Sequence, residues 1–526
     1  MAAKKPAPAR TVLIIDVGTS SVKAALFDEA GRTLRSADAP ITTAVPQPGW
    51  AEQDPAAWWK ATIDAVRALA VDIQPIAITL TGSMQNVILL GRDGASVRPA
   101  LLYSDARVTA AEIEAVKAQL PGDFETRIGN RAEPALCLFR LDWLLNHEID
   151  TMTAVERVLF GAKDAVIHRM TGRAVVDPTC ATTTGLLNLA ERHWDATILG
   201  AIGLSLRILP DILDADALAG PLLPEPAAAL GLKPGIPVYV GAGDGGATAW
   251  GTSSEQHDRP HAYLGTTGWI AATMPYSVAK PPRDAYTLAA PVGTDVIVIS
   301  PFLAAGLAID WFANVAGRPV AELYAAAEAQ DANPPGALFL PYLIGERAPF
   351  SDRAVRGAFF GLDRDHAPEA LAYAVLEGLA HAIRDNLDAL PIEPATIALA
   401  GGVAGSLTMA HLIADVTGAK VTVPAASRIV TAYGAFRIVA PIIGLRRQGQ
   451  LGGRQGQRAT KSEGAANAGS RSGKASGKAE KSPAAGDETV VKPRKGRAKR
   501  AARRFAAYRQ AAAHAGALAA ALDPAL

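Results

Sequence analysis

Apolar residues near the start of the chain alternate between short runs typical of strands and a longer stretch with helical spacing. Residues 11–15 are apolar and β-branched, "DVGTSS" is a turn and "VKAALFD" alternates, which predicts two strands. The next hairpin turn is "EAGR". In "EQDPAAWWKATIDAVRALA", Asp54 suits the N-cap and Pro55 the first helical position, so a helix is predicted. Strands and helices alternate through residue 250, which favours a mixed α/β fold.

The pattern restarts after residue 250. The stretch "HAYLGTTGWIAATM" repeats the plan of "LIIDVGTSSVKAAL", which indicates two lobes of similar design, although Gly-Thr turns are common enough to match by chance. A helix is predicted over 367–390, because an apolar residue recurs at every fourth position, at Leu371, Val375, Leu379, Ile383 and Leu387. The stretch "TIALAGGVAGSLTMAHLIADVTGAKVTVP" predicts a strand, a glycine turn, a helix that stops at Gly418, and a strand.

The composition changes over residues 445–489, which are rich in Gly, Ser, Ala, Lys and Gln and almost free of large apolar residues. Such a segment buries too little surface to offset its ordering entropy, so a disordered basic insertion is predicted. The expected organisation is a flexible leader (1–10), a first lobe (11–250), a second lobe (251–444), the insertion, and a basic segment with a terminal helix (490–526). The insertion is expected to be a tolerated loop, and the alternative is a tether for polyanions through "KPRKGRAKRAARR".

Bulk properties narrow the class of protein. A chain of 526 residues suggests two or three domains, and 49% hydrophobic with 20% charged residues indicates a globular protein with an ample core. The net charge of +1 gives the whole molecule no strong preference for nucleic acid or anionic membrane. Cys137 and Cys180 lack metal-ligand spacing and are expected to be buried thiols. No signal peptide and no spanning apolar run is found, so the cytoplasm is the expected location.

The turn "DVGTSS" is a candidate phosphate site. The backbone N–H groups and hydroxyls of Gly18, Thr19 and Ser20 are able to surround phosphate oxygens. Asp16 would lie beside them, where a carboxylate suits Mg²⁺, and Lys23 would add positive charge. The alternative is an ordinary hairpin with an Asp cap and a solvated lysine. The turn is not a P-loop, which needs a lysine inside the glycine run.

Two further glycine turns are also candidate ligand sites. "LGTTGW" offers Gly265, Thr266 and Thr267 as a second phosphate turn. "AGGVAGS" offers Gly401 and Gly402 at the start of a helix, where a flat ligand such as adenine has close access to the backbone. Taken alone, each turn is a weak signal, because a glycine turn at a strand–helix junction usually has a structural role.

Asp244 is a lone acid in "VYVGAGDGGATAWG". Its glycine neighbours would let a ligand approach closely. A lone carboxylate in a cleft is able to accept the proton of a substrate hydroxyl, as phosphoryl transfer to an alcohol requires. The alternative, equally weighted, is an Asp that turns a loop through its own backbone.

Together these motifs resemble those of the FGGY family of carbohydrate kinases, from about residue 11 to 444 and again in the final helix. The motifs in order are "IDVGTSSVK", "GWAEQDPAAWW", "ALLYSDAR", "GAGDGGA", "YLGTTGW", "FLPYLIGERAPFSDRAVRGAFFGL", "AVLEGLAHAI" and "GGVAGS". Within the family the chain looks most similar to xylulokinases. The resemblance implies an α/β, two-lobed actin-like ATPase fold, related to ribonuclease H, with a cleft between the lobes.

The resemblance also implies a role for each matching residue. Asp244 would be the catalytic base and Asp16 would organise Mg²⁺. ATP would be held by the phosphate turns and the nucleotide-bordering glycines, namely Gly18, Thr19, Ser20, Lys23, Gly265, Thr266, Thr267, Gly401, Gly402 and Ser406. Met84 and Gln85 would contact the sugar. Asp105 and Arg107 match a nearby acid–arginine pair, for which a structural salt bridge is an equally weighted alternative.

Three departures from the xylulokinase pattern lie in or near the sugar pocket. Those enzymes usually have Met-His at Met84-Gln85, Asp-Asn where Gly245 follows Asp244, and tryptophan at Tyr103. Glutamine keeps its hydrogen-bonding groups but carries no charge. Because a pocket that reads hydroxyl groups discriminates strongly, these changes affect the identity of the sugar rather than the phosphoryl chemistry.

The resulting hypothesis is an ATP- and Mg²⁺-dependent sugar kinase that converts D-xylulose to xylulose 5-phosphate. The first alternative is another substrate, such as ribulose, gluconate or erythritol. The second is a non-catalytic actin-like protein that binds nucleotide. Nucleic acid would bind through the basic tail at most, no membrane partner is expected, and a homodimer is possible from the resemblance alone.

Overall fold

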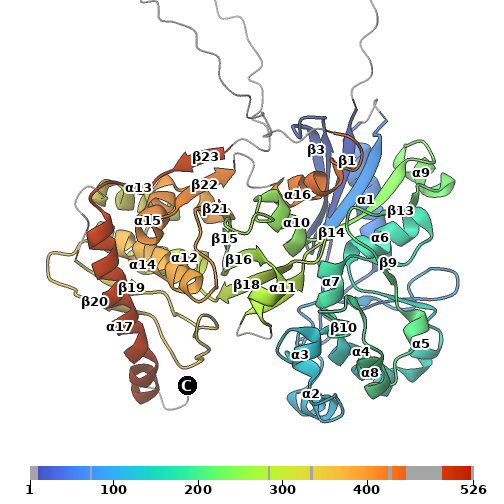
Figure 1. The fold of residues 1–526 in the computed structure, drawn as a ribbon, viewed down its shortest axis with the longest axis horizontal. Coiled ribbons are helices and arrows are strands. Elements are labelled where there is room, and N and C mark those ends of the chain that lie inside the picture. The colour runs from blue at the N-terminus through green and yellow to red at the C-terminus, as the bar shows by residue number, and fades with distance from the viewer. Residues whose placement is uncertain are drawn as a thin grey trace, which may run out of the picture.

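Two mixed β-sheets form the centres of two lobes (Figure 1). The computed structural model describes residues 10–70, 74–281, 285–331, 334, 336–424, 429–445 and 488–522. The first sheet has the order β13 (Leu218–Pro221), β14 (Pro237–Gly243), β5 (Ala77–Gly82), β1 (Val12–Val17), β2 (Ser21–Phe27) and β3 (Thr33–Pro40). The second has the order β17 (Tyr286–Ala289), β18 (Val296–Phe302), β16 (Gly268–Met274), β15 (His261–Leu264), β21 (Thr396–Ala400), β22 (Lys420–Pro424) and β23 (Glu488–Val491).

The two sheets share a topology. In the first, β1 pairs antiparallel with β2 and parallel with β5, which in turn pairs parallel with β14. In the second, β15 pairs antiparallel with β16 and parallel with β21, which pairs parallel with β22. The two Gly-Thr turns join equivalent hairpins, so the prediction of two lobes of similar design is confirmed.

Side chains alternate along each strand, so β1 contributes to a core on both faces of the first sheet. Leu13, Ile15 and Val17 of β1 pack in one core cluster with α1 (Pro55–Ala68), α6 (Ala162–Thr171) and α9 (Pro224–Leu230). Val12 and Ile14 pack on the opposite face with α10 (Asp244–Gly251) and α16 (Val430–Val439). Thus α16, which follows β22 of the second sheet in sequence, lies against the first sheet.

The helix predictions hold in detail. Asp54 caps α1, accepting a hydrogen bond from Ala56 N, and Pro55 is its first residue. The apolar stripe predicted over 367–390 lies on α14 (Pro368–Asp388), and Gly418 ends α15 (Leu407–Thr417). Helices α14 and α15, with α12 (Gly306–Ala316) and α13 (Val320–Gln330), build the core of the second lobe.

The remaining elements are short or lie in the outer part of the first lobe. The helices are α2 (Ala110–Lys117), α3 (Phe124–Ile128), α4 (Cys137–His147), α5 (Ile149–Thr153), α7 (Pro178–Thr182), α8 (Ala196–Ala201) and α11 (Tyr276–Ala279). The strands are β4 (Glu52–Gln53), β6 (Ile88–Leu90), β7 (Ala100–Leu101), β8 (Arg157–Leu159), β9 (Val175–Val176), β10 (Leu187–Asn188), β11 (His193–Trp194), β12 (Asp211–Ile212), β19 (Leu338–Leu340) and β20 (Ala358–Phe360). Cys137 and Cys180 are buried free thiols, as predicted.

The end of the chain docks on the second lobe. Most of the predicted insertion 445–489 lies outside the described residues, but Glu488 and Thr489 at its end belong to β23 and pair with β22, so that end of the insertion was placed wrongly. Helix α17 (Ala498–Leu522) follows, and its Arg500 and Arg504 pair with the buried Glu377 of α14. Arg494 pairs with Asp331 and Asp415. Arg494, Arg500 and Arg504 of the basic segment therefore have carboxylate partners within the lobe. None of the helices in the described part of the chain combines the length and apolar character that a membrane crossing needs.

Candidate active site

Three chain segments meet at one edge of the first sheet. Because β1, β5 and β14 run parallel, their carboxyl ends lie together. The turn 18–20 follows β1, Met84 and Gln85 follow β5, and Asp244 follows β14. Neighbouring strands are about 4.8 Å apart. Because β5 lies between β1 and β14, the turn 18–20 and Asp244 lie roughly 10 Å from each other. The structure thus brings together the residues predicted to hold phosphate, sugar and the catalytic proton.

Asp244 is the first residue of α10, and its side chain is exposed. Its Oδ1 accepts a hydrogen bond of 2.8 Å from Gly245 N. Part of the carboxylate is open to solvent, but the protein packed around it reduces its hydration and raises the pKa of Asp244 to about 7, and the charges of Asp16 and Asp177 raise it further. A carboxylate that titrates near neutrality suits proton transfer from an alcohol.

The glycines around Asp244 serve close packing. Gly241 has a φ of +64° and lies against the backbone of Leu80, where any side chain would overlap. A Cβ at Gly243 would overlap Met84, and one at Gly251 would overlap the Val430 carbonyl of α16. The glycine run therefore seats α10 between β5 and α16, and this packing fixes where Asp244 begins the helix.

Asp16 points to the same face of the sheet as α10. Its register partner on β2 is Lys23, whose charge lowers the pKa of Asp16, but burial outweighs it and raises that pKa overall. Among the described residues there is no group of three or more His, Cys, Asp or Glu that would hold a metal alone. The half-buried carboxylate of Asp16, beside the turn predicted to bind phosphate, fits Mg²⁺, which is usually bound through one or two carboxylates plus substrate phosphates.

The two Gly-Thr turns are held by their carbonyl groups. The carbonyl oxygen of Thr19 accepts from Gln53 Nε2 at 2.7 Å, and that of Ser20 accepts from Ile41 N at 2.9 Å. In the second lobe, Gly306 N donates to the Gly265 carbonyl at 2.7 Å and Leu307 N donates to the Thr266 carbonyl at 3.0 Å. The hydroxyl-bearing Ser20, Thr266 and Thr267 are exposed. The turns are thus fixed from within and present polar groups outward.

The third glycine turn lies at the edge of the second sheet. Because β15 and β21 are parallel, the turn after β21 adjoins Gly265–Thr267. Gly401 has a φ of +94° and lies against the backbone of Leu264, which excludes a side chain. Gly402 is exposed, and Ser406 caps α15 by accepting from Met409 N at 3.2 Å. The Ser406 hydroxyl therefore has a structural partner at the place where it was predicted to border nucleotide.

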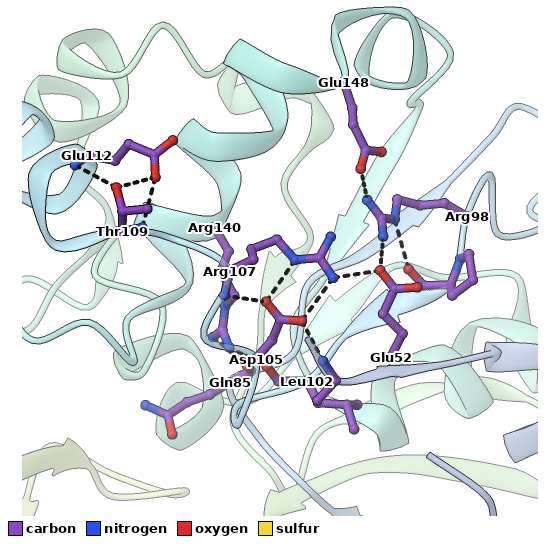
Figure 2. Close-up of polar contacts among 12 residues, drawn as sticks. Glu52, Gln85, Arg98, Leu102, Asp105, Arg107, Thr109, Glu112, Arg140 and Glu148 are labelled. Carbon is purple, nitrogen blue, oxygen red and sulfur yellow. Dashed lines mark hydrogen bonds and ion pairs between the residues drawn. The ribbon is translucent and has the colours of Figure 1, made fainter. Parts of the chain in front are cut away.

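The predicted sugar residues lie on a loop with a constrained backbone. Gln85 has a φ of +60°, and its carbonyl accepts a hydrogen bond of 2.7 Å from Arg140, which also donates to the carbonyl of Leu102. Figure 2 shows the amide of Gln85 extending away from these contacts. Tyr103 is 47% exposed. Arg140 thus joins the loop of Gln85 to the loop of Tyr103.

Asp105 and Arg107 form a pair whose side chains have no exposed surface (Figure 2). Asp105 Oδ1 accepts from Arg107 N and Nε, and Oδ2 accepts from Ala51 N and Arg107 Nη2. Arg107 also pairs with Glu52 at 2.6 Å and lies 3.9 Å over the ring of Trp50. A carboxylate with two hydrogen bonds on each oxygen has little capacity left for a sugar hydroxyl. These contacts favour the structural salt bridge, which supports the pocket from behind.

Sequence reasoning missed Glu52 and Arg140, which hold this region together. Glu52 pairs with Arg98 and Arg107, and Arg140 is 1% exposed. Glu52 pairs with arginines 46 and 55 positions away, and the carbonyl groups of Leu102 and Gln85 that bind Arg140 lie 38 and 55 positions away. The only local signal for Arg140 is a charged residue in the otherwise apolar stretch 136–141.

Both lobes match domains of a known protein family. Residues 11–251 match the N-terminal domain, and residues 262–440 the C-terminal domain, of the FGGY family of carbohydrate kinases. The xylulose kinase of Escherichia coli (strain K12) is 34% identical over 433 residues, which cover 81% of this chain and 88% of that protein. The gluconokinase of Bacillus licheniformis is 27% identical over 465 residues, which cover 84% and 88%. The crystal structure of xylulose kinase from Rhodospirillum rubrum has a TM-score of 0.79 at 25% identity, covering 98% of this chain and 99% of that one.

Proposed function

Because this chain belongs to the FGGY family of carbohydrate kinases, we propose that it transfers the γ-phosphate of ATP to a hydroxyl of a pentulose, D-xylulose. The observation that carries the proposal is the position of Asp244. Its carboxylate lies at the sheet edge shared by the turn 18–20 and the loop of Met84 and Gln85, and its pKa is raised to about 7. The substrate follows the similarity to xylulose kinases.

In the proposed reaction Asp244 acts as the general base. Its carboxylate accepts the proton of the sugar hydroxyl as the hydroxyl oxygen forms a bond to the γ-phosphorus. The bond from that phosphorus to the bridging oxygen breaks, and ADP leaves with its electron pair. Neither step involves a redox change. The exposed carboxylate leaves room for the hydroxyl, and its pKa permits proton uptake at neutral pH.

Asp16 would hold the Mg²⁺ that accompanies ATP, and Mg²⁺ supplies positive charge to the phosphate oxygens when bound. The turns 18–20 and 265–267 would donate hydrogen bonds to the phosphates from their hydroxyl groups and from the backbone N–H groups of Thr19, Ser20, Thr266 and Thr267, whereas the N–H groups of Gly18 and Gly265 already donate within the turns. Lys23 would add charge on the same face as Asp16. The backbone at Gly401 and Gly402 would border the nucleotide.

The sugar would lie against Met84, Gln85 and Tyr103. Met84 packs on Gly243 beside the base, and the amide of Gln85 offers both a donor and an acceptor to sugar hydroxyls. Gly245 adds no polar group there. Asp105 and Arg107 would act on the sugar only through the loop that they support. Cytoplasmic location and a homodimer stay predictions.

The proposal is tested by measuring ADP release from Mg²⁺-ATP with D-xylulose, L-xylulose, D-ribulose, L-ribulose, D-gluconate, glycerol and erythritol. We expect D-xylulose to give the highest kcat/KM and Asp244→Ala to remove most of the turnover while retaining nucleotide binding. A higher kcat/KM for gluconate would reassign the substrate, and the relationship to a gluconokinase makes this the main competing outcome. No response to any compound would contradict a sugar kinase of this substrate range.

A further inference from the structure

A buried ion cluster lies behind the catalytic edge. Lys163 of α6 contacts Asp164 at 2.6 Å and Asp177 at 3.0 Å, and the side chains of all three have no exposed surface. Burial opposes the charge of Lys163, but the two carboxylates outweigh it and raise the pKa of its ammonium group. The lysine is therefore charged, and a buried charge is retained only with such partners.

The cluster reaches the peptide that precedes the base. Asp177 Oδ1 accepts a hydrogen bond of 3.1 Å from the backbone N–H of Gly243, the residue directly before Asp244. Asp177 Oδ2 accepts from Thr179 N and Cys180 N and so caps α7. One carboxylate thus ties the end of β14 to the start of a neighbouring helix.

The start of α6 also holds the predicted sugar loop. Ala162 N donates to the carbonyl of Ser83 at 3.1 Å, and Asn86 N donates to the carbonyl of Phe160 at 2.9 Å. These bonds lie on either side of Met84 and Gln85. Residues 160–163 therefore contact the loop predicted to face the sugar, and through Lys163 they contact the residue that fixes Gly243.

Stability alone is a poor explanation for this cluster. Burying three charged groups removes their hydration, and replacing a buried ion pair with apolar residues of similar volume is often neutral or stabilising. An apolar substitute for Asp177 would lack both the cap of α7 and the acceptor for the Gly243 N–H, and only the second contact reaches the residue before Asp244. Without that acceptor, the turn from β14 into α10 would lose the side-chain contact that sets its position.

We propose that the Lys163–Asp177 ion pair is a positioning device that holds the peptide before Asp244 in register with the loop of Met84 and Gln85. The inference rests on the proposed function, because it concerns the base and the sugar loop of that reaction. Neither Lys163 nor Asp177 touches substrate. They act by fixing the distance between the base and the attacking hydroxyl, and a misplacement of about 1 Å is able to cost on the order of 100-fold in rate.

The kinetic test compares Asp177→Ala with Asp177→Asn. The alanine variant lacks the acceptor for Gly243 N–H, and we expect its kcat to fall about 100-fold while the KM for ATP changes less than about threefold. The asparagine variant keeps an acceptor oxygen, and its kcat should exceed that of the alanine variant at least about tenfold. Equal kcat values for the two variants would overturn the proposal.

The matched control is Glu377→Gln in the second lobe. Glu377 is also a buried carboxylate, 2% exposed and paired with arginines, but it lies on α14 away from the first sheet. This variant should lose stability and keep its kcat within about threefold of wild type. A fall in kcat that matched the Asp177→Ala value would mean that loss of any buried ion pair lowers turnover, and would overturn the assignment.

Hydrogen exchange gives a readout that needs no activity. In Asp177→Ala, or in Lys163→Met if the alanine variant does not fold, the peptide 241–246 should exchange at least about tenfold faster than in wild type, with 268–274 unchanged. Unchanged exchange at 241–246 would overturn the proposal whatever the turnover. If wild type shows no turnover with any sugar, the proposed function fails, and the exchange data still decide whether the pair positions this turn.

Discussion

The two Gly-Thr turns join hairpins of the same topology, but different side chains lie beside them. In the first hairpin, the cross-strand pair two residues before Gly18 is Asp16 with Lys23. In the second, the pair at the equivalent place is Tyr263 with Trp269, whose rings stack 4.1 Å apart. The fold repeats the turn, but only the first copy places charges beside it.

This difference bears on which turn would only bind the nucleotide and which would also take part in the reaction. Both turns present polar groups outward, and both lie at the carboxyl edge of a sheet. Only the first edge also carries Asp16 and Asp244, and the pKa of Asp244, the proposed base, is raised by burial and further by the charge of Asp16. We infer that the second turn contributes hydrogen bonds to the nucleotide, whereas the first also takes part in the reaction.

One substitution in each cross-strand pair tests whether the two turns differ in chemistry. Asp16→Asn should lower kcat on the order of 100-fold, because it removes the carboxylate that would organise Mg²⁺ beside the phosphates. Tyr263→Phe keeps the ring stack and should change kcat less than about threefold. Steady-state ADP release measures both. Comparable losses in the two variants would mean that the turns are chemically equivalent.

A smaller effect is expected from the second turn itself. Thr266→Val removes an exposed hydroxyl while the carbonyl of residue 266 keeps its bonds to Ala305 N and Leu307 N. One hydrogen bond to a charged group contributes about 1.5–3 kcal/mol, so the KM for ATP should rise about tenfold or more with little change in kcat. A fall in kcat at unchanged KM would contradict a purely binding role.

The pH dependence tests the charges of the first edge. The base must be ionised, and the pKa of Asp244 is raised to about 7. The value of kcat/KM should therefore fall about tenfold between pH 8 and pH 6 and be level above pH 8. A profile that stays flat down to pH 5 would show that the base is not a carboxylate with a raised pKa.

The smallest expected effect is on stability. The pKa of Asp244 is higher in the folded chain than its usual value, so ionising it opposes folding as pH rises from about 4 through 7. Asp244→Asn removes that charge and should raise Tm by about 1–3 °C at pH 8, with little gain at pH 4, where the wild-type group is protonated in the folded chain and only about half ionised in the unfolded chain. A gain of equal size at both pH values would point to a cause other than charge.

Local patterns were enough to predict the parts of the site that lie in single turns. The Gly-Thr turns, the cap at Asp54 and the stripe on α14 depend on residues within a few positions of one another. The glycines around Asp244 were noticed for a different reason. They were expected to admit a ligand, whereas Gly241, Gly243 and Gly251 are required by packing against Leu80, Met84 and Val430.

Contacts between distant segments could not be predicted. Asp177 reaches Gly243 across 66 positions, and Arg504 reaches Glu377 across 127. Helix α16 looks like any apolar helix in sequence, and only the folded chain shows that it packs on the first sheet. The local sequence and the family resemblance predicted roles for Asp16 and Asp244, but the packing and ion pairs around them depend on the tertiary structure.

The most direct test of the account follows a single turnover of Asp244→Asn by chemical quench, with saturating Mg²⁺-ATP and D-xylulose and with both ligands shown to bind. Asparagine keeps the size of the side chain and loses the proton acceptor. We expect the variant to form sugar phosphate about 10²–10⁴-fold more slowly than the wild-type enzyme. Formation at the wild-type rate would contradict the assignment of Asp244 as the base.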